Sequence, residues 1–138
     1  MYKLKIDNDC RHWFKNGKCH RSRDFPAIIT AMGNKYWCKD GIFHRDNDLP
    51  AIERVDGTKE WRKYGKEYYI EEYDNGSKEY YDENKNLHKD DGPAVNYSNG
   101  DKEYWCYGKR HRKNGPAVII GNKQYWFENG EFKKCIVY

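Results

Sequence analysis

Histidines followed by a basic residue are the side chains in this sequence with the clearest potential for chemistry. They occur four times, and each pair is followed, after a short loop, by Pro-Ala. Regularly spaced imidazoles suggest metal binding, and regularly spaced Arg and Lys suggest binding of anions. The four His–Arg pairs, which form a candidate anion-binding stripe, are His20-Arg21, His44-Arg45, His88-Lys89 and His111-Arg112.

The spacing of these histidines argues against a metal site. If each lies on one repeat of a sheet, equivalent residues two strands apart are almost 10 Å from each other, because neighbouring strands are ~4.8 Å apart. Ligands of one zinc ion lie ~2.0–2.3 Å from the metal. We therefore predict no metal and no cofactor, and expect the histidines to bond the backbone near a turn.

The cysteines and aspartates do not predict an active site. Cys19 precedes His20, but neighbours on a strand point to opposite faces and cannot form a nucleophile–base pair. The carboxylates before Pro-Ala, such as Asp24 and Asp46, are typical of loops whose backbone they cap. No phosphate-binding or nucleophile motif occurs. We predict that the chain is not an enzyme. The scattered cysteines are expected to be reduced thiols: Cys10, Cys19, Cys38, Cys106 and Cys135.

The composition favours a thin sheet over a thick globular core. Of the 138 residues, 37% are hydrophobic and 17% are aromatic, with 13 Tyr and 5 Trp. Tyr and Trp suit half-buried positions, because the ring packs while the polar group stays near water. The net charge of +4 is small and the charges are well mixed, and no run of five like charges suggests a charged tail.

Internal repeats organise the whole chain. An aromatic anchor recurs at intervals of about 24 residues, and a Gly follows most anchors by four residues. We interpret residues 1–138 as a single repeat domain with a shortened third copy, in which Gly65 is followed by neither His-Arg nor Pro-Ala. The predicted anchors are Trp13, Trp37, Trp61, Tyr81, Trp105 and Trp126.

Turn signals predict two strands in each repeat. Asn16-Gly17, Asp40-Gly41 and Asn129-Gly130 are typical of two-residue hairpin turns, which need positive φ at both positions. A second set of glycine turns lies between Pro-Ala and the next anchor. The fold class predicted is all-β: an elongated, single-layer antiparallel meander of tandem β-hairpins.

Alternation along the strands suggests an interface. We expect the anchor Trp and the Ile or Val two residues after each Pro to share one face as an apolar stripe. Open edges and a thin array favour a protein partner, most simply a homodimer, through this stripe or through the last strand, residues 132–138. The predicted interface residues are Trp37, Ile52, Trp61, Tyr68, Tyr69, Ile136 and Tyr138.

The repeat unit resembles a known family. The segments Gly-Lys-Cys-His-Arg (17–21), His44-Arg45 with Pro50-Ala51-Ile52, and Gly-Lys-Arg-His-Arg (108–112) with Pro116-Ala117-Val118 resemble MORN-repeat variants encoded by large DNA viruses of amoebae. The resemblance covers about residues 10–138. It implies a viral protein with an elongated sheet of hairpins that serves as a scaffold for protein–protein contact, and no enzymatic activity.

An alternative function is binding of anionic phospholipid or nucleic acid through the His–Arg stripe. The start, Met1-Tyr2-Lys3-Leu4, has no apolar segment typical of a signal peptide. No apolar run reaches the ~18 residues of a membrane span. We expect a protein that is not secreted and is cytoplasmic, which for a viral protein means the host cytoplasm or the virion.

Overall fold

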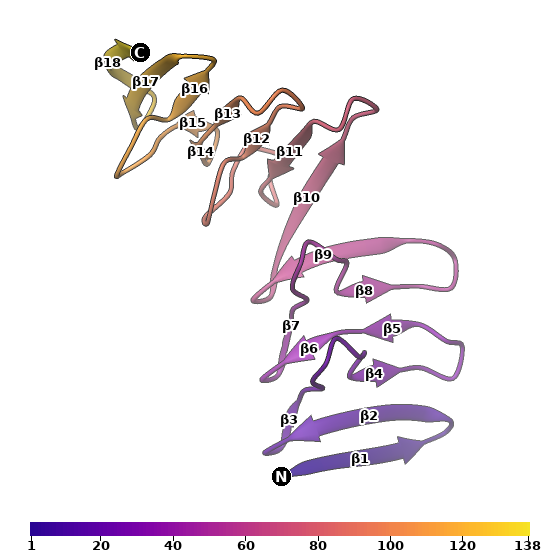
Figure 1. The fold of residues 1–138 in the computed structure, drawn as a ribbon. Coiled ribbons are helices and arrows are strands. Elements are labelled where there is room, and N and C mark those ends of the chain that lie inside the picture. The colour runs from indigo at the N-terminus through magenta and orange to yellow at the C-terminus, as the bar shows by residue number, and fades with distance from the viewer. The chain divides into compact units, whose positions relative to one another are not determined.

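A computed structural model describes residues 1–138, and every regular element in it is a β-strand. The predicted all-β meander is confirmed. Strands that follow one another in sequence pair side by side in an open, single-layer antiparallel sheet, and short hairpins branch from it (Figure 1). Contacts divide the chain into two compact units, Met1–Tyr68 and Tyr69–Tyr138.

Unit 1 contains the first nine strands and the start of a tenth. They are β1 (Tyr2–Asp7), β2 (Cys10–Lys15), β3 (Lys18–Cys19), β4 (Ile28–Ile29), β5 (Lys35–Tyr36), β6 (Cys38–Lys39), β7 (Ile42–Phe43), β8 (Ile52–Glu53), β9 (Lys59–Lys63) and β10 (Lys66–Glu72). β10 pairs with β9 through its first residues and with a strand of unit 2 through its last residues.

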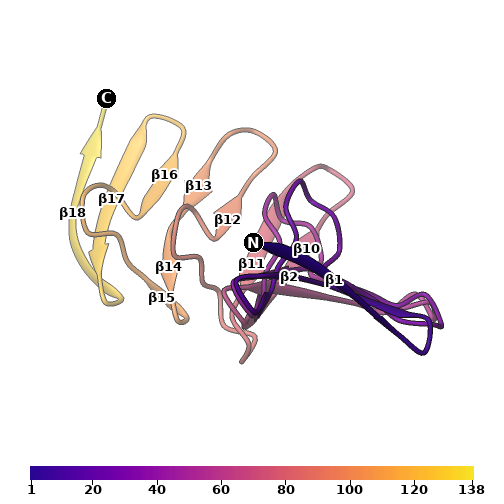
Figure 2. The same cartoon turned by 90° about the horizontal axis from the view of Figure 1, so that it is seen from below.

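Unit 2 contains the remaining strands, several of which lie side by side in Figure 2. They are β11 (Lys78–Tyr81), β12 (Val95–Asn96), β13 (Lys102–Glu103), β14 (Trp105–Cys106), β15 (Lys109–Arg110), β16 (Val118–Ile120), β17 (Lys123–Glu128) and β18 (Glu131–Val137). β6–β7 and β14–β15 form small two-stranded ladders beside the main path of the sheet.

The predicted hairpin turns are present. Asn16 and Gly17 have φ of 51° and 77°, and Asp40 and Gly41 have φ of 50° and 86°. Both central residues therefore lie in the left-handed region, which Asn, Asp and Gly tolerate best. Each of these turns sends the chain back into a short strand that carries the next cysteine or aromatic residue.

The prediction that Trp and Ile share one face is wrong. In the sheet, Ile52 lies opposite Tyr36, the residue before the anchor. The Trp37 backbone N–H instead bonds the carbonyl of Ala51, at 2.8 Å. Residues directly opposite each other share a face, and neighbours along a strand alternate. The Ile and Val side chains therefore belong to the face of Tyr36, and the alanines of Pro-Ala belong to the face of Trp37.

Two of the predicted anchors are also wrong. The N–H of Tyr80 bonds the carbonyl of Ala94 at 2.8 Å, and the N–H of Tyr104 bonds that of Ala117 at 2.6 Å. These bonds match the bond from Trp37 to Ala51. Tyr80 and Tyr104 thus take the anchor position in place of Tyr81 and Trp105, their C-terminal neighbours. With this register, Gly108 and His111 fall four and seven residues after their anchor, as in the first two copies.

Small residues form the centre of the core. The four alanines of the Pro-Ala motif have no exposed surface, and Trp37 and the Ile or Val residues of copies two, four and five are also buried. Those alanines are Ala27, Ala51, Ala94 and Ala117. The copy that lacks Pro-Ala and His-Arg is the β9–β10 hairpin, and the boundary between the two units lies within its second strand.

Candidate functional site

The histidine of each His–Arg pair joins two successive repeats. His44 accepts a hydrogen bond at Nδ1 from the backbone N–H of Tyr64, 20 residues later, at 2.9 Å. The expectation that these histidines bond the backbone near a turn is confirmed. The other three make the same contact: Asp40 N–H to His20, Tyr107 N–H to His88 and Asn129 N–H to His111, at 3.0–3.1 Å.

The second ring nitrogen bonds a loop carboxylate in two of the pairs. Nε2 of His44 lies 2.8 Å from Asp46, and Nε2 of His88 lies 2.9 Å from Asp90. Because Nδ1 accepts a bond, Nε2 carries the proton and donates it. The hydrogen bond from His44 lowers the pKa of Asp46. Both nitrogens of these rings are occupied, and no group of three or more His, Cys, Asp or Glu side chains is arranged to hold a metal ion.

The basic residue of each His–Arg pair stacks on the anchor of its own repeat. The distances from the cation to the ring centroid are 3.7 Å for Arg21 on Trp13, 3.8 Å for Arg45 on Trp37, 3.9 Å for Lys89 on Tyr80 and 4.0 Å for Arg112 on Tyr104. These are cation–π contacts. They identify the anchor of each repeat independently of the backbone bonds.

The arginines of these pairs also bond the backbone. Arg45 donates to the carbonyl of Pro50 at 3.1 Å and holds both carboxylate oxygens of Asp24, at 2.8 and 3.0 Å. Arg21 and Arg112 donate to Pro26 and Pro116 in the same way. Burial, followed by the charge of Arg11, lowers the pKa of Arg21. The side chains of the predicted anion-binding stripe therefore contact their own repeat and the neighbouring repeats.

Most of the predicted interface residues lie inside their units. Trp37 is 6% exposed and Ile52 is 3% exposed, while Trp61, Tyr68, Tyr69 and Ile136 are half-buried. Tyr138 is 74% exposed. Of the two predicted surfaces, the Trp–Ile stripe is covered within the chain and the last strand, β18, is accessible. All residues of this strand except Ile136 are exposed.

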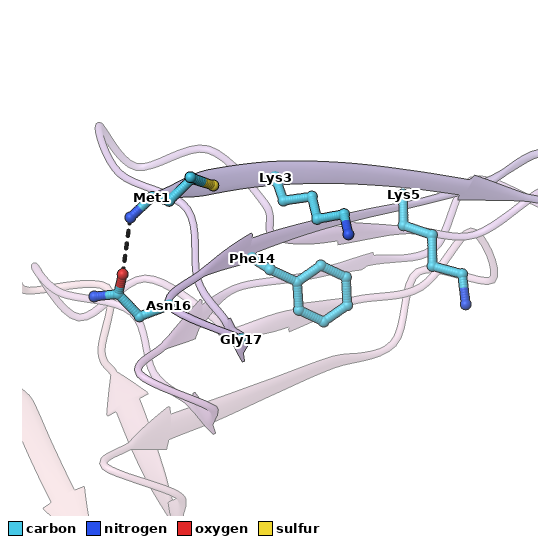
Figure 3. Close-up of a pocket in the computed structure, with 6 residues that line it drawn as sticks. All are labelled: Met1, Lys3, Lys5, Phe14, Asn16 and Gly17. Carbon is cyan, nitrogen blue, oxygen red and sulfur yellow. Dashed lines mark hydrogen bonds between the residues drawn. The ribbon is translucent and has the colours of Figure 1, made fainter.

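A cationic hollow that sequence reasoning missed lies on the first hairpin. It has a volume of about 380 Å³, and Lys3, Lys5 and Phe14 line it together with Met1, Asn16 and Gly17 (Figure 3). Lys3 lies directly opposite Phe14 and Lys5 opposite His12, whose ring is parallel to that of Phe14 with the centroids 6.1 Å apart. The first 23 residues contain seven basic and two acidic side chains, a net charge of +5, whereas the whole chain carries +4.

A second missed feature is a set of glutamates at the strand position of Tyr36. In unit 2, Glu103 is buried, and it accepts bonds from Tyr97 at 2.7 Å and from Arg110 at 3.1 Å. The bond to Glu103, and then burial, raise the pKa of Tyr97 to about 12. In the sequence, Glu60 directly precedes the anchor Trp61. This was the signal from which the set of glutamates could have been predicted.

Glu60 provides a pH-dependent prediction. Hydrogen bonds from Arg54 and then Arg62 lower its pKa. A carboxylate with a lowered pKa stabilises the fold above its unfolded pKa of about 4.3, and this contribution is lost as the pH falls through the folded pKa. We expect Glu60→Gln to lower the free energy of unfolding by about 0.5–1 kcal/mol at pH 7. The difference from the wild type should be smaller at about pH 3 than at pH 7. Urea unfolding at both pH values tests this, and an equal loss at both would contradict it.

Comparison with known proteins gives no further assignment: no family model, no curated protein and no solved structure matches this chain. The structure contains no helix long and apolar enough to span a membrane. The resemblance to MORN repeats therefore remains a resemblance in sequence pattern.

Proposed function

We propose that this protein is a non-catalytic repeat scaffold that acts through protein–protein contact, and that it associates with a second copy through the outer edge of β18. The proposal rests on the unpaired outer edge of β18 and its exposed apolar side chains. β18 pairs only with β17 and ends the sheet, and Phe132, Val137 and Tyr138 are 58%, 60% and 74% exposed. Unpaired strands with apolar side chains favour strand addition. A viral, MORN-like origin is part of the proposal and agrees with the repeat pattern.

The backbone of β18 indicates which groups face outward. The carbonyl of Tyr125, which lies opposite Cys135, bonds Ala117 on the other side of β17. Cys135 therefore directs its N–H and C=O away from β17, and Val137 does the same, because backbone direction alternates along a strand. The alternation ends before Lys133, where the β17–β18 register shifts by one residue at a β-bulge. The N–H of Tyr138 points inward to Asn122, at 2.9 Å, which agrees with this alternation.

These directions favour one register for the dimer. Antiparallel pairing about a twofold axis at Cys135 places Lys134 opposite Ile136, and Val137 opposite the bulged segment at Lys133. No like charges then face each other. An axis at Lys134 would place two ammonium groups opposite each other, which is destabilising. The proposed contact is therefore isologous, with Cys135 of both copies at its centre.

Sedimentation velocity with and without one substitution tests the dimer. Val137→Pro removes an outward N–H and should give a monomer, whereas Val137→Thr keeps the N–H and should dimerise. Mild oxidation of the wild type should link the two copies through Cys135, because paired strands bring the Cα atoms to ~5.5 Å. A wild-type protein that remains monomeric at high concentration, or a disulfide-linked dimer that Cys135→Ser also forms, would contradict the proposed contact.

The cationic hollow supports a second candidate function, binding of single-stranded nucleic acid. Lys3 and Lys5 would contact phosphates, and Phe14 offers a ring on which a base can stack. Neither Lys3 nor Lys5 forms an ion pair with a carboxylate. Fluorescence anisotropy with a labelled oligonucleotide at low salt should show binding that Lys3→Glu/Lys5→Glu abolishes and that Lys59→Glu/Lys66→Glu retains. Binding to anionic vesicles alone would assign the lysines to lipid, and binding to neither would remove this function.

A further inference from the structure

A thiol and an imidazole meet on β2, beside the cationic hollow. Sγ of Cys10 lies 3.0 Å from Nε2 of His12, within hydrogen-bond distance. Residues two apart on a strand point to the same face, so this pair has the arrangement that Cys19 and His20, as direct neighbours, cannot take. A nucleophile and a base within hydrogen-bond reach of each other are the two parts of an activated thiol.

The same face of the first hairpin carries the lysines of the hollow. Three cross-strand pairs follow one another on it: Lys3 with Phe14, Lys5 with His12, and Asp7 with Cys10. Lys5 lines the hollow (Figure 3), so the hollow ends one cross-strand pair away from the thiol. On the other side of β2, the residue opposite His12 is Ile28, which carries no charge. The charged groups that face the thiol and the imidazole across the strands therefore come from β1.

Cys10 differs from the other cysteines of the chain in its partner and its access. It is half-buried, so a reagent in solvent can reach it, whereas Cys38 is 5% exposed. Cys19 and Cys106 are half-buried as well, but the thiol that bonds an imidazole is that of Cys10. Cys135 is exposed and lies in β18, the last strand of the sheet.

The charges around Cys10 indicate which kind of reagent the thiol would take. The ammonium groups of Lys3 and Lys5 attract anions and raise their local concentration. Asp7, opposite Cys10, offers a carboxylate to a cationic group. A peptide that carries carboxylates together with an ammonium group matches both signs. Glutathione is the simplest peptide thiol with these groups, and its disulfide is the probe that this face favours.

We propose that Cys10 is a modification site, at which a disulfide of an anionic peptide thiol attaches one half of itself to the protein as a mixed disulfide. Nε2 of His12 takes the proton from Sγ of Cys10, and the thiolate attacks one sulfur of the reagent. A new S–S bond joins that sulfur to Cys10, and the S–S bond of the reagent breaks. The departing thiolate takes the proton from His12 and leaves as a thiol. The reagent is the oxidant, because its departing sulfur is reduced as the sulfur of Cys10 is oxidised.

The attached peptide would remain on the face of the hollow. Its carboxylates would lie beside Lys3 and Lys5, where they compete with any other anion for the two ammonium groups. Such a modification is reversible, because a free thiol in excess exchanges with the mixed disulfide and releases Cys10. This inference depends neither on the proposed dimer nor on binding of nucleic acid.

The test uses the full chain carrying Cys135→Ser, so that the exposed thiol of β18 cannot react. With glutathione disulfide at pH 7, we expect the intact mass to rise by one glutathionyl group, which dithiothreitol removes. Non-reducing peptide mapping should place the group on Cys10. Cys10→Ser should lose this reaction, and Cys106→Ser should react as the parent does. A label that appears first on Cys19, Cys38 or Cys106 would overturn the inference.

A substitution of the imidazole tests the role of His12 as the base. Free thiols are only a few per cent ionised at pH 7, so His12→Ala should slow the reaction of Cys10 by about tenfold at this pH. At pH 10 thiols ionise without a base, and the variant should react about as fast as the parent. An equal loss of rate at both pH values would show that His12 acts only through packing, and the proposed mechanism would be wrong.

A change of charge tests the selection of the reagent. Lys3→Glu/Lys5→Glu should slow the reaction with glutathione disulfide by about tenfold, and it should leave the reaction with the uncharged hydroxyethyl disulfide unchanged. An unchanged rate with the uncharged reagent also shows that the variant keeps its fold around Cys10. Equal slowing with both reagents, or with neither, would contradict the selection of an anionic peptide.

Discussion

Replacement of Trp37 by alanine is expected to lower the free energy of unfolding by about 3–5 kcal/mol, which is typical of large aromatic residues removed from a core. Trp37 is 6% exposed. Its indole N–H donates to the carbonyl of Asp24 at 3.0 Å, and Arg45 stacks on its ring. The substitution therefore leaves a cavity, an unpaired carbonyl and a guanidinium without its aromatic partner. Urea unfolding followed by circular dichroism measures the loss.

Two further variants make this result specific. Trp37→Phe keeps an aromatic ring for Arg45 and loses the indole N–H and part of the buried ring, so its effect should be smaller than that of alanine. Met32→Ala changes a side chain that is 76% exposed in the same unit, and it should change stability by less than about 0.5 kcal/mol. A loss below about 1 kcal/mol for Trp37→Ala would mean that the ring contributes little to the core.

The meander could be predicted because its turns are encoded locally. Asn16-Gly17 and Asp40-Gly41 favour positive φ without help from distant residues, and the structure has it at all four positions. The bond from each histidine to a turn backbone could also be anticipated, because the histidines follow the turns at a constant distance. These features repeat, so that one copy supports the interpretation of the next.

The assignment of faces failed because it depends on a register that no short segment encodes. Alternation along the strand shows which residues share a face with Trp37. It does not show whether Ala51 or Ile52 lies opposite Trp37 on the neighbouring strand. The tertiary bond between Trp37 and Ala51 decides this. The same limit explains the anchors: Tyr80-Tyr81 and Tyr104-Trp105 are aromatic pairs, and only the backbone partner distinguishes their members.

The His–Arg pairs were the strongest candidate site, and the structure gives each residue of the pair an internal contact. Arg45 stacks on Trp37 and binds Asp24. These contacts could not be derived from the sequence, because Asp24 belongs to the preceding repeat and a hairpin turn separates Trp37 from Arg45. The cationic hollow was missed for the same reason, because it joins residues from strands whose alignment had to be known first.

Replacement of His44 by alanine is expected to lower the free energy of unfolding by about 2–4 kcal/mol, from the lost packing and from a backbone donor left without its acceptor. His44 is 4% exposed. Its Nδ1 accepts the N–H of Tyr64, and its Nε2 donates to Asp46. Alanine leaves the Tyr64 N–H without its acceptor, so hydrogen exchange at this amide should accelerate more than exchange at amides of β1 and β2.

Asparagine at the same position separates the bond from the packing. The side-chain oxygen of Asn can stand close to the place of Nδ1, so His44→Asn should restore protection of the Tyr64 amide and recover part of the stability. His12→Ala is the matched control, because His12 is half-buried and its ring bonds only the thiol of Cys10. If alanine and asparagine at position 44 give the same exchange rate at Tyr64, the histidine contributes through packing alone. In that case its bond to the next repeat does not hold the two copies together.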